Sequence, residues 1–316
     1  MGRRHKGRPI DGVFLLDKPP GSSSNYVLQR IKRSFGAAKA GHTGALDPLA
    51  TGMLPLTFGE ATKFSQFLLD ADKRYQTTVK LGIRTDSSDA DGEIVEQKTV
   101  SSDIDEALIS KLLVEHFTGL IEQVPSMFSA LKHNGQPLYK LARKGEKVEV
   151  KPRQVTIHNI ELLAFRPEEN EFDLDVRCSK GTYIRSIAED LGMLLGCGGH
   201  VKVLRRLESG PYKAESMISM EQFEALLTNL ENETDEVRYK ALDTLLIPSY
   251  SPVEHLPKLS LSDQQKEQLF QGKPISIEQP EDLYRLHVLS DDQFVGIGVI
   301  DDKQILRSKR LLNTTS

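Results

Sequence analysis

The sequence has little cysteine and no cluster of metal ligands. Its 316 residues include only Cys178 and Cys197, with no C-x-x-C pair, so neither a disulfide framework nor a structural zinc site is predicted. The eight histidines are scattered without an H-E-x-x-H pattern, which argues against metal catalysis. We expect both thiols in the core and no bound metal.

Long apolar runs and cofactor-binding loops are also missing. No segment approaches the roughly 20 apolar residues that span a bilayer, and the start, MGRRHKGRPIDGVFLL, lacks a signal peptide's apolar stretch and cleavage site. We therefore expect a cytoplasmic protein that does not enter membranes. No G-K-[ST], G-x-G-x-x-G or G-x-S-x-G pattern is present, so nucleotide cofactors and a hydrolase nucleophile elbow find no support.

Charge is unevenly distributed along the chain. The formal net charge of -4 argues against indiscriminate binding of nucleic acid. Basic residues nevertheless crowd the start at positions 3, 4, 6, 8, 30, 32 and 33, whereas the charged residues between 221 and 243 are mostly acidic. A local basic surface can attract phosphates, although a solvated terminus explains the first cluster equally well.

Hydrophobic patterning predicts both helices and strands, and the length of 316 residues allows two domains. The hydrophobic content of 38% indicates a packed chain. A strand is expected from Gly12 to the prolines at 19 and 20, helices over 22–36, 59–73 and 101–119, and a strand opening near Tyr75. In FDLDVRCSKGTYIRSIAEDLG, alternation changes to helical spacing, which places Tyr183 and Arg185 at a strand-to-helix corner.

The last part of the chain is predicted to be a separate small module. Prolines at 252 and 257 mark a boundary, and the short apolar runs beyond it are broken by Asp-Asp turns, as expected of a β-rich domain. We place the domains at residues 1–250 and 251–316.

One loop, GHTGALDPLATG at residues 41–52, holds a single acidic side chain, Asp47. With an ordinary pKa of about 3.9, such a carboxylate is ionised at neutral pH and could act as a nucleophile without an activating base. An aspartate before proline also commonly caps a turn, and turn aspartates greatly outnumber catalytic ones. Taken singly, His42, Tyr75, Tyr183 and Arg185 have equally ordinary structural explanations. The residues narrow the site without naming a reaction.

Several longer segments carry a family resemblance. LDKPPGSSS, AGHTGALDPLATGMLPLTFGEATKF, DKRYQTTVKLG, PSMFSALKHNGQPLYKLARKG, CSKGTYIRSIAEDLG and HVKVLRRLESG follow one another through the chain. Together they resemble the bacterial TruB family of tRNA pseudouridine synthases over essentially the whole length. The resemblance implies an α/β (α+β) catalytic domain around a mainly antiparallel sheet, followed by a PUA domain that binds RNA.

The resemblance also implies a reaction. A uridine in the tRNA T loop, position 55 in tRNA nomenclature, becomes pseudouridine: the N1–C1′ bond breaks, the uracil turns, and C5 joins C1′. No atom is gained or lost and no redox change occurs, so no cofactor is expected. The implied partner is the tRNA T arm at the elbow, with a monomeric enzyme and no obligate protein partner.

Residue roles are carried over from the matching motifs. Asp47 matches the catalytic aspartate, whether it attacks C1′, adds to C6 or assists elimination. Arg185 matches the arginine that pairs with it and would hold it anionic. Tyr75 matches the tyrosine that stacks on the target uracil and helps to remove the C5 proton.

Four further matches concern the pocket and its surroundings. Tyr183 and Leu204 match pocket residues, and Lys18 would support the pocket floor. His42 matches a histidine that fills the space beside the everted base. Phosphate contacts could come from the basic N-terminal region and from Lys132, Arg143, Arg205 and Arg206, although each of these four residues is equally well explained as a solvated surface charge. Phe128 stands where the family often has tyrosine.

Two other functions remain open from the sequence. One is an RNA-folding chaperone or binding module that clamps the tRNA elbow, an activity that can coexist with catalysis. The other is a base-excising enzyme of the glycosidase type, which would generally need a second carboxylate that the motif does not show.

Overall fold

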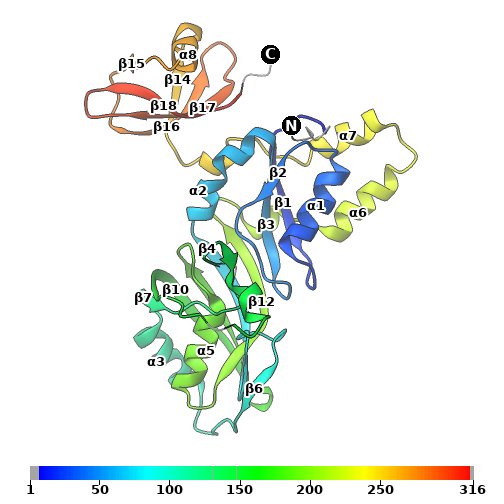
Figure 1. Ribbon diagram of the computed structural model, residues 1–316, viewed down its shortest axis with the longest axis vertical. Coiled ribbons are helices and arrows are strands. Elements are labelled where there is room, and N and C mark those ends of the chain that lie inside the picture. The colour runs from blue at the N-terminus through cyan, green and yellow to red at the C-terminus, as the bar shows by residue number, and fades with distance from the viewer. Residues whose placement is uncertain (1–6, 130, 147, 314–316) are drawn as a thin grey trace.

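A large mixed sheet forms the body of the molecule. The computed structural model describes residues 7–129, 131–146 and 148–313, and its nine-stranded sheet runs in the order β13-β1-β3-β12-β4-β11-β10-β7, with β2 beside β3 (Figure 1). The strands are β1 Gly12–Lys18, β2 Ala40–His42, β3 Thr51–Phe58, β4 Lys73–Leu81, β7 Gly119–Gln123, β10 Arg153–Arg166, β11 Glu171–Cys178, β12 Gly199–Ser209 and β13 Ile218–Ser219.

Most neighbouring strands in this sheet are antiparallel. The pairs β1/β3, β2/β3, β4/β12, β4/β11, β10/β11 and β7/β10 all run in opposite directions. Parallel pairing joins β1 to β13 and β3 to β12. The prediction of a mixed α/β fold around a mainly antiparallel sheet is confirmed.

The β3/β12 contact is a short seam between two halves of the sheet. It pairs Arg205 with Thr51 and Arg206 with Gly52. Gly52 has a φ of +98°, and a Cβ there would stand 2.1 Å from the carbonyl oxygen of Arg206. Only glycine permits this approach of the two backbones. The seam places the loop before β3 next to β12 and β4.

Helices cover the sheet and close its core. They are α1 Ser24–Ser34, α2 Ser65–Asp70, α3 Glu106–His116, α4 Leu138–Ala142, α5 Ile184–Leu194, α6 Met220–Asn229 and α7 Asp235–Asp243. α5 packs on β12, α3 on β10, and α6 on β1 (Figure 1). The acidic stretch 221–243 therefore forms a structural layer, in which the Phe223 ring lies 5.5 Å from the Phe14 ring.

Local signals in the sequence agree with most element boundaries. Ser23 caps α1 by accepting from the Tyr26 amide, and Ser219 forms a capping box with Gln222 at α6. The single helix expected over 59–73 is a 3₁₀ helix, Gly59–Phe64, followed by α2, which ends at Asp70 because Ala71 is extended and β4 begins at Lys73.

Two small hairpins extend from the large sheet. They are β5 Ile83–Thr85 with β6 Ile94–Gln97, and β8 Lys132–His133 with β9 Gln136–Pro137. The second turns at Asn134 and Gly135, both with positive φ, which is typical of an Asn-Gly hairpin turn. Cys178 and Cys197 are buried free thiols.

The C-terminal part has its own sheet and core. Its strands run in the order β14-β16-β17-β18-β15, and the elements are β14 Lys258–Leu261, α8 Asp263–Phe270, β15 Ile275–Ser276, β16 Asp282–Val288, β17 Phe294–Ile300 and β18 Ile305–Leu311. Phe294 and Ile297 pack against Phe64 and Val253, with the Phe64 and Phe294 rings 5.3 Å apart. Among the described residues, no helix is long and apolar enough to cross a membrane.

Candidate active site

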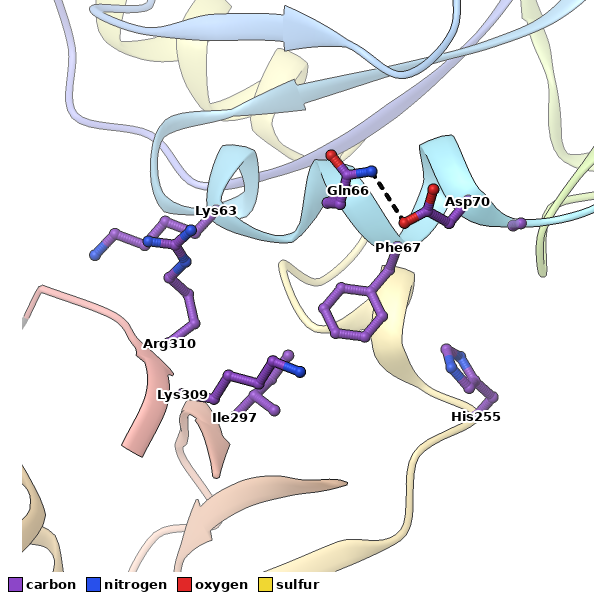
Figure 2. A pocket seen from close by; sticks show the side chains of 9 residues that line it. Lys63, Gln66, Phe67, Asp70, His255, Ile297, Lys309 and Arg310 are labelled. Atoms are coloured by element: carbon purple, nitrogen blue, oxygen red, sulfur yellow. Dashed lines mark hydrogen bonds between the residues drawn. The ribbon is translucent and has the colours of Figure 1, made fainter. Parts of the chain in front are cut away.

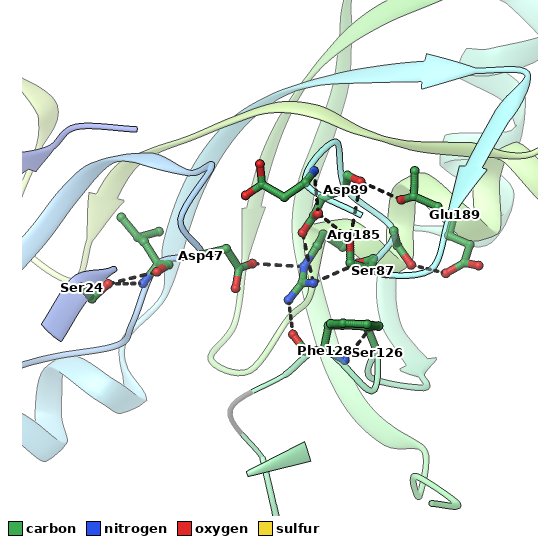
Figure 3. A network of polar contacts seen from close by, with 12 residues as sticks. Ser24, Asp47, Ser87, Asp89, Ser126, Phe128, Arg185 and Glu189 are labelled. Carbon is green, nitrogen blue, oxygen red and sulfur yellow. Dashed lines mark hydrogen bonds and ion pairs between the residues drawn. The ribbon is translucent and has the colours of Figure 1, made fainter. Parts of the chain in front are cut away.

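Asp47 lies on the loop that joins β2 to β3, and this loop is held from two sides. The Ser24 hydroxyl, at the start of α1, accepts from the Leu46 amide at 2.8 Å and donates to its carbonyl at 3.0 Å. The Pro48 carbonyl accepts from the Gly21 amide at 2.8 Å and from Lys18 Nζ at 3.2 Å. The carboxylate of Asp47 points across to Arg185 rather than back to its own turn (Figure 3).

Arg185 is the centre of a buried polar network (Figure 3). Its Nε lies 3.1 Å from Asp47 Oδ2, and its NH1 lies 3.2 Å from Asp89 Oδ2. NH1 also donates to the Ser87 carbonyl at 2.9 Å, and NH2 donates to the Phe128 carbonyl at 3.0 Å. Arg185 is 3% exposed. A planar guanidinium with donors in a fixed fork can serve these four acceptors at once.

Burial and charge act against one another on Asp47. Desolvation raises the pKa of the Asp47 carboxyl, Arg185 lowers it, and the nearby carboxylates Asp89 and Asp91 raise it further. The net direction is upward, although 37% of the Asp47 side chain is exposed to the cavity. Asp47 therefore takes up a proton at a higher pH than an ordinary aspartate, and Arg185 is the largest influence that limits this rise.

The predicted pocket residues meet around one cavity of about 290 Å³. Asp47, Tyr75, Tyr183, Arg185 and Leu204 all line it. This volume is near the lower end of the roughly 300–1,000 Å³ typical of small-molecule sites. The cavity therefore suits a single base with its sugar.

Tyr75 and Leu204 come from neighbouring strands in the floor of the cavity. Tyr75 on β4 stands opposite Arg206 on β12, and Leu204 stands opposite Thr77. Burial raises the pKa of the Tyr75 hydroxyl, and the charge of Arg206 opposes this rise. Leu204 is 6% exposed and offers an apolar surface.

Tyr183 sits at the strand-to-helix corner that the sequence predicts. It is the N-cap residue of α5, where Gln123 fixes its backbone by accepting from its amide at 3.0 Å and donating to its carbonyl at 3.2 Å. The Arg153 guanidinium lies 4.5 Å from the centre of the Tyr183 ring. Both the backbone and the ring of this corner residue are thus held.

Lys18 and His42 lie beside the cavity and are not part of its lining. Lys18 is fully buried, and burial lowers its pKa to about 8; its ammonium donates to the carbonyls of Pro19 and Pro48 at 2.8 and 3.2 Å. Lys18 therefore positions the loop that carries Asp47. His42 is on β2, and burial, aided by the charge of Arg206, lowers its pKa, so its ring is neutral at physiological pH.

Two of the basic residues that could contact phosphates have partners within the protein. Arg206 is 2% exposed and donates to the Met53 carbonyl at 2.6 Å and the Gly44 carbonyl at 3.0 Å. Arg205 pairs with Asp17, with an NH2–Oδ2 distance of 2.6 Å. Strand alternation turns the two arginines to opposite faces, and each meets acceptors of the fold. Arg206 also lines the wall of the cavity, a position that its sequence context does not indicate.

Sequence reasoning also missed Asp89 and Lys73. Asp89 belongs to TDSSDADG, which has the composition of a solvated turn, yet it is 4% exposed and accepts from the Ser87 hydroxyl at 2.6 Å. Lys73 lines the cavity, and its ammonium donates to the carbonyls of Leu68, Leu69 and Ala71 at 2.6–3.0 Å. No sequence signal separates these residues from surface charges.

The basic start of the chain is described only in part. Arg3, Arg4 and Lys6 lie outside the described residues. Arg8 pairs with Asp243 at 2.5 Å and lies 4.1 Å from the centre of the Tyr239 ring. Arg8 therefore stabilises the packing of the N-terminal segment against α7.

Comparison with known proteins decides the family. Three protein-family models match successive parts of the chain. Residues 32–184 match the family described as "TruB family pseudouridylate synthase (N terminal domain)", residues 185–254 match "tRNA pseudouridylate synthase B C-terminal domain", and residues 257–312 match "Pseudouridine synthase II TruB, C-terminal". The chain belongs to the TruB family. It is therefore an enzyme of the pseudouridine synthase class.

TruB relatives match over nearly their full length. The tRNA pseudouridine synthase B of Aliivibrio salmonicida is 50% identical over 99% of this chain and 97% of the relative, and that of Photobacterium profundum is 49% identical over 99% and 98%. The crystal structure of a Cbf5-Nop10-Gar1 complex aligns with a TM-score of 0.69 at 28% identity, covering 93% of this chain and 79% of the other.

Proposed function

We propose that this TruB protein converts uridine 55 in the tRNA T loop to pseudouridine, with Asp47 as the catalytic carboxylate. Its action on tRNA uridine follows from the family and its close relatives. The observation that supports the site is the meeting of Asp47, Arg185 and two tyrosines around one base-sized cavity.

The side chains that line the cavity can be assigned to separate steps of the isomerisation. Asp47, held by Arg185, supplies the anion that the breaking of the N1–C1′ bond requires, whichever of C1′, C6 or an elimination step it serves. Tyr75 lines the cavity and offers a ring for stacking on the uracil. Its oxygen would accept the C5 proton only as the phenolate, after giving up its own proton, which the raised pKa of the buried hydroxyl disfavours. Tyr183 and Leu204 bound the space in which the detached uracil turns. Arg185 positions Asp47 through its ion pair.

The base must leave its stack to reach Asp47. Extrusion costs a few kcal/mol, and stacking on an aromatic ring recovers roughly 1–3 kcal/mol per base. His42, neutral at physiological pH because its pKa is lowered, offers an uncharged ring to fill the vacated space. Phosphate contacts from Lys132 and Arg143 supply further binding energy, since both residues lie on the β8–α4 region at the surface.

The two parts of the chain divide this work. Residues 1–250 form the catalytic domain, and residues 251–316 form a PUA-like RNA-binding domain. The separate sheet and core of the C-terminal part support this division. We propose a monomer that acts in the cytoplasm on the T arm at the tRNA elbow, with no cofactor and no obligate protein partner.

Base excision fits the geometry less well. A glycosidase mechanism generally uses two carboxylates that flank the scissile bond. Asp89, the second carboxylate of the network, has a side chain only 6% exposed, is bound to Arg185, and does not line the cavity.

The deciding experiment treats an unmodified tRNA transcript with wild-type protein and with Asp47→Asn protein, without added cofactor or metal. Carbodiimide mapping should show pseudouridine at position 55 with the wild type alone, and the mass of the RNA should not change. Loss of a base from the RNA would indicate excision instead. A wild-type enzyme that modifies another position would refute the assignment to position 55.

A further inference from the structure

A second, larger cavity lies between α2 and the C-terminal domain (Figure 2). It has a volume of about 590 Å³, within the range of small-molecule sites. Its wall contains side chains from α2, from β18 and from the linker before β14, namely Gln66, Phe67, Asp70, His255, Lys309 and Arg310. We call it the interdomain groove.

A β-bulge aims two adjacent cations into this groove. In the β17/β18 ladder, Ile297 pairs with Arg310 and Gly298 pairs with Ser308, so Lys309 is an extra, unpaired residue. Neighbouring residues on a regular strand point to opposite faces, whereas a bulge redirects a side chain. Lys309 and Arg310 therefore both line the groove. Gly296 permits the local backbone path, since a Cβ there would stand 2.3 Å from the Arg310 carbonyl oxygen.

These two cations are the uncompensated charges of the groove. Both are exposed, and no carboxylate among the described residues lies within 4.0 Å of either. The other charges are matched: Lys63 pairs with Glu60 at 2.6 Å, and Asp70 pairs with Lys180 at 2.8 Å. The groove consequently favours an anionic occupant.

An aromatic surface lies beside the cations (Figure 2). The Phe67 ring is half-buried, and the exposed His255 ring is 6.3 Å from it at an interplanar angle of 56°. The buried side chain of Ile297 also lines the groove. An aromatic ring next to unpaired cations is the combination that binds single-stranded nucleic acid, because bases stack while phosphates contact the charges.

The groove adjoins the candidate active site through α2. Leu69 lines the catalytic cavity, and the next residue, Asp70, lines the groove. Asp70 holds Lys180, which is flanked in sequence by two residues of the catalytic cavity wall, Ser179 and Gly181. An RNA bound in the catalytic cavity can therefore continue across the end of α2 into the groove.

We propose that the interdomain groove binds an unpaired nucleotide of the tRNA substrate other than the isomerised uridine, with its phosphates on Lys309 and Arg310 and its base against Phe67. This inference rests on the proposed function. The groove adds affinity for RNA and takes no part in the chemistry.

The test compares Lys309→Ala/Arg310→Ala with a matched control, Lys273→Ala/Lys303→Ala. The control removes two exposed lysines of the same domain that do not line the groove. Equilibrium binding of an unmodified tRNA transcript is measured over a series of salt concentrations, together with KM and kcat. Phe67→Leu, which keeps an apolar side chain, tests stacking, and thermal melting checks that each variant is folded.

The groove variant should raise Kd and KM at least about fivefold at low salt while kcat at saturating RNA stays unchanged. Its slope of log Kobs against log salt should fall by about 1.4, as expected for two lost contacts to a single strand. Phe67→Leu should raise Kd about fivefold or more. Repeating the measurement with an isolated T-arm hairpin locates the nucleotide: a loss on both RNAs places it in the T arm, and a loss on tRNA alone places it outside.

Equal affinity and salt slope in the groove and control variants would overturn the proposal and would leave the groove to another occupant, such as an acidic peptide. A fall in kcat with no change in KM would also overturn it. Failure of the proposed function gives a different result, because the wild type would then bind tRNA without forming pseudouridine.

Discussion

Replacing Arg185 by methionine should damage stability and catalysis through two separable effects. Arg185 is buried between Asp47 and Asp89 and also serves the Ser87 and Phe128 carbonyls. Its removal leaves Asp89, which is 4% exposed, without its cation. Breaking a buried ion pair on one side costs about 3–5 kcal/mol, which for a domain of this size lowers Tm by about 6–20 °C.

The catalytic effect acts through the protonation of Asp47. Arg185 is the main influence that lowers the pKa of this carboxyl, so its loss raises that pKa further. The reaction needs the carboxylate, which is lost as pH falls through the folded pKa. The acidic limb of the kcat/KM profile should therefore move to higher pH in Arg185→Met, as measured by tritium release from uridine-labelled tRNA over a pH series.

A second substitution separates the two effects. Arg185→Met/Asp89→Asn removes the stranded buried charge, so it should recover part of the lost Tm. It should not return kcat/KM to the wild-type value, because Asp47 still lacks its cationic partner, but removal of the Asp89 charge should move the acidic limb part of the way back toward lower pH. This account of the network would be refuted if Arg185→Met alone melted within about 2 °C of the wild type. It would also be refuted if the acidic limb of the Arg185→Met pH profile did not move.

Two further substitutions test the scaffold. Gly52→Ala should destabilise the protein by more than about 3 kcal/mol in urea unfolding, since it adds strain at positive φ to a 2.1 Å approach to the Arg206 carbonyl; Gly41→Ala, whose nearest neighbour would be 3.7 Å away, should change little. The second concerns Lys73, whose pKa is lowered to about 8 by burial. Between about pH 8 and 10.5 the unfolded chain binds more protons there, so wild-type stability relative to Lys73→Met should rise with pH, by about 3 kcal/mol in all. If the difference in unfolding free energy between the wild type and Lys73→Met stayed constant across that pH range, burial would not lower the pKa of Lys73 as described.

Local patterns predict much of the fold because they are short-range. Ser23 and Ser219 cap helices as their positions indicate, and the change of period after Cys178 marks the corner that presents Tyr183 and Arg185. The loop of Asp47 is recognisable because its glycines and its lone acid stand in one segment. These features depend on neighbours along the chain.

The remaining features depend on partners that are distant in sequence. Alternation along β12 shows that Arg205 and Arg206 face opposite ways, but only the pairing with β3 and β4 determines which one lines the cavity. The sequence around Asp89 is typical of a solvated turn, and only the structure shows that Asp89 pairs with Arg185, which is distant in the sequence. The interdomain groove likewise requires α2 and the bulge in β18 to meet.

The most direct measurement of the central claim is pseudouridine formation by Asp47→Asn, which keeps the shape of the side chain and removes its charge. We predict tRNA affinity and Tm close to the wild type and no pseudouridine at position 55 after prolonged incubation with excess enzyme. Pseudouridine formed at the wild-type rate by this variant would show that another group performs the chemistry.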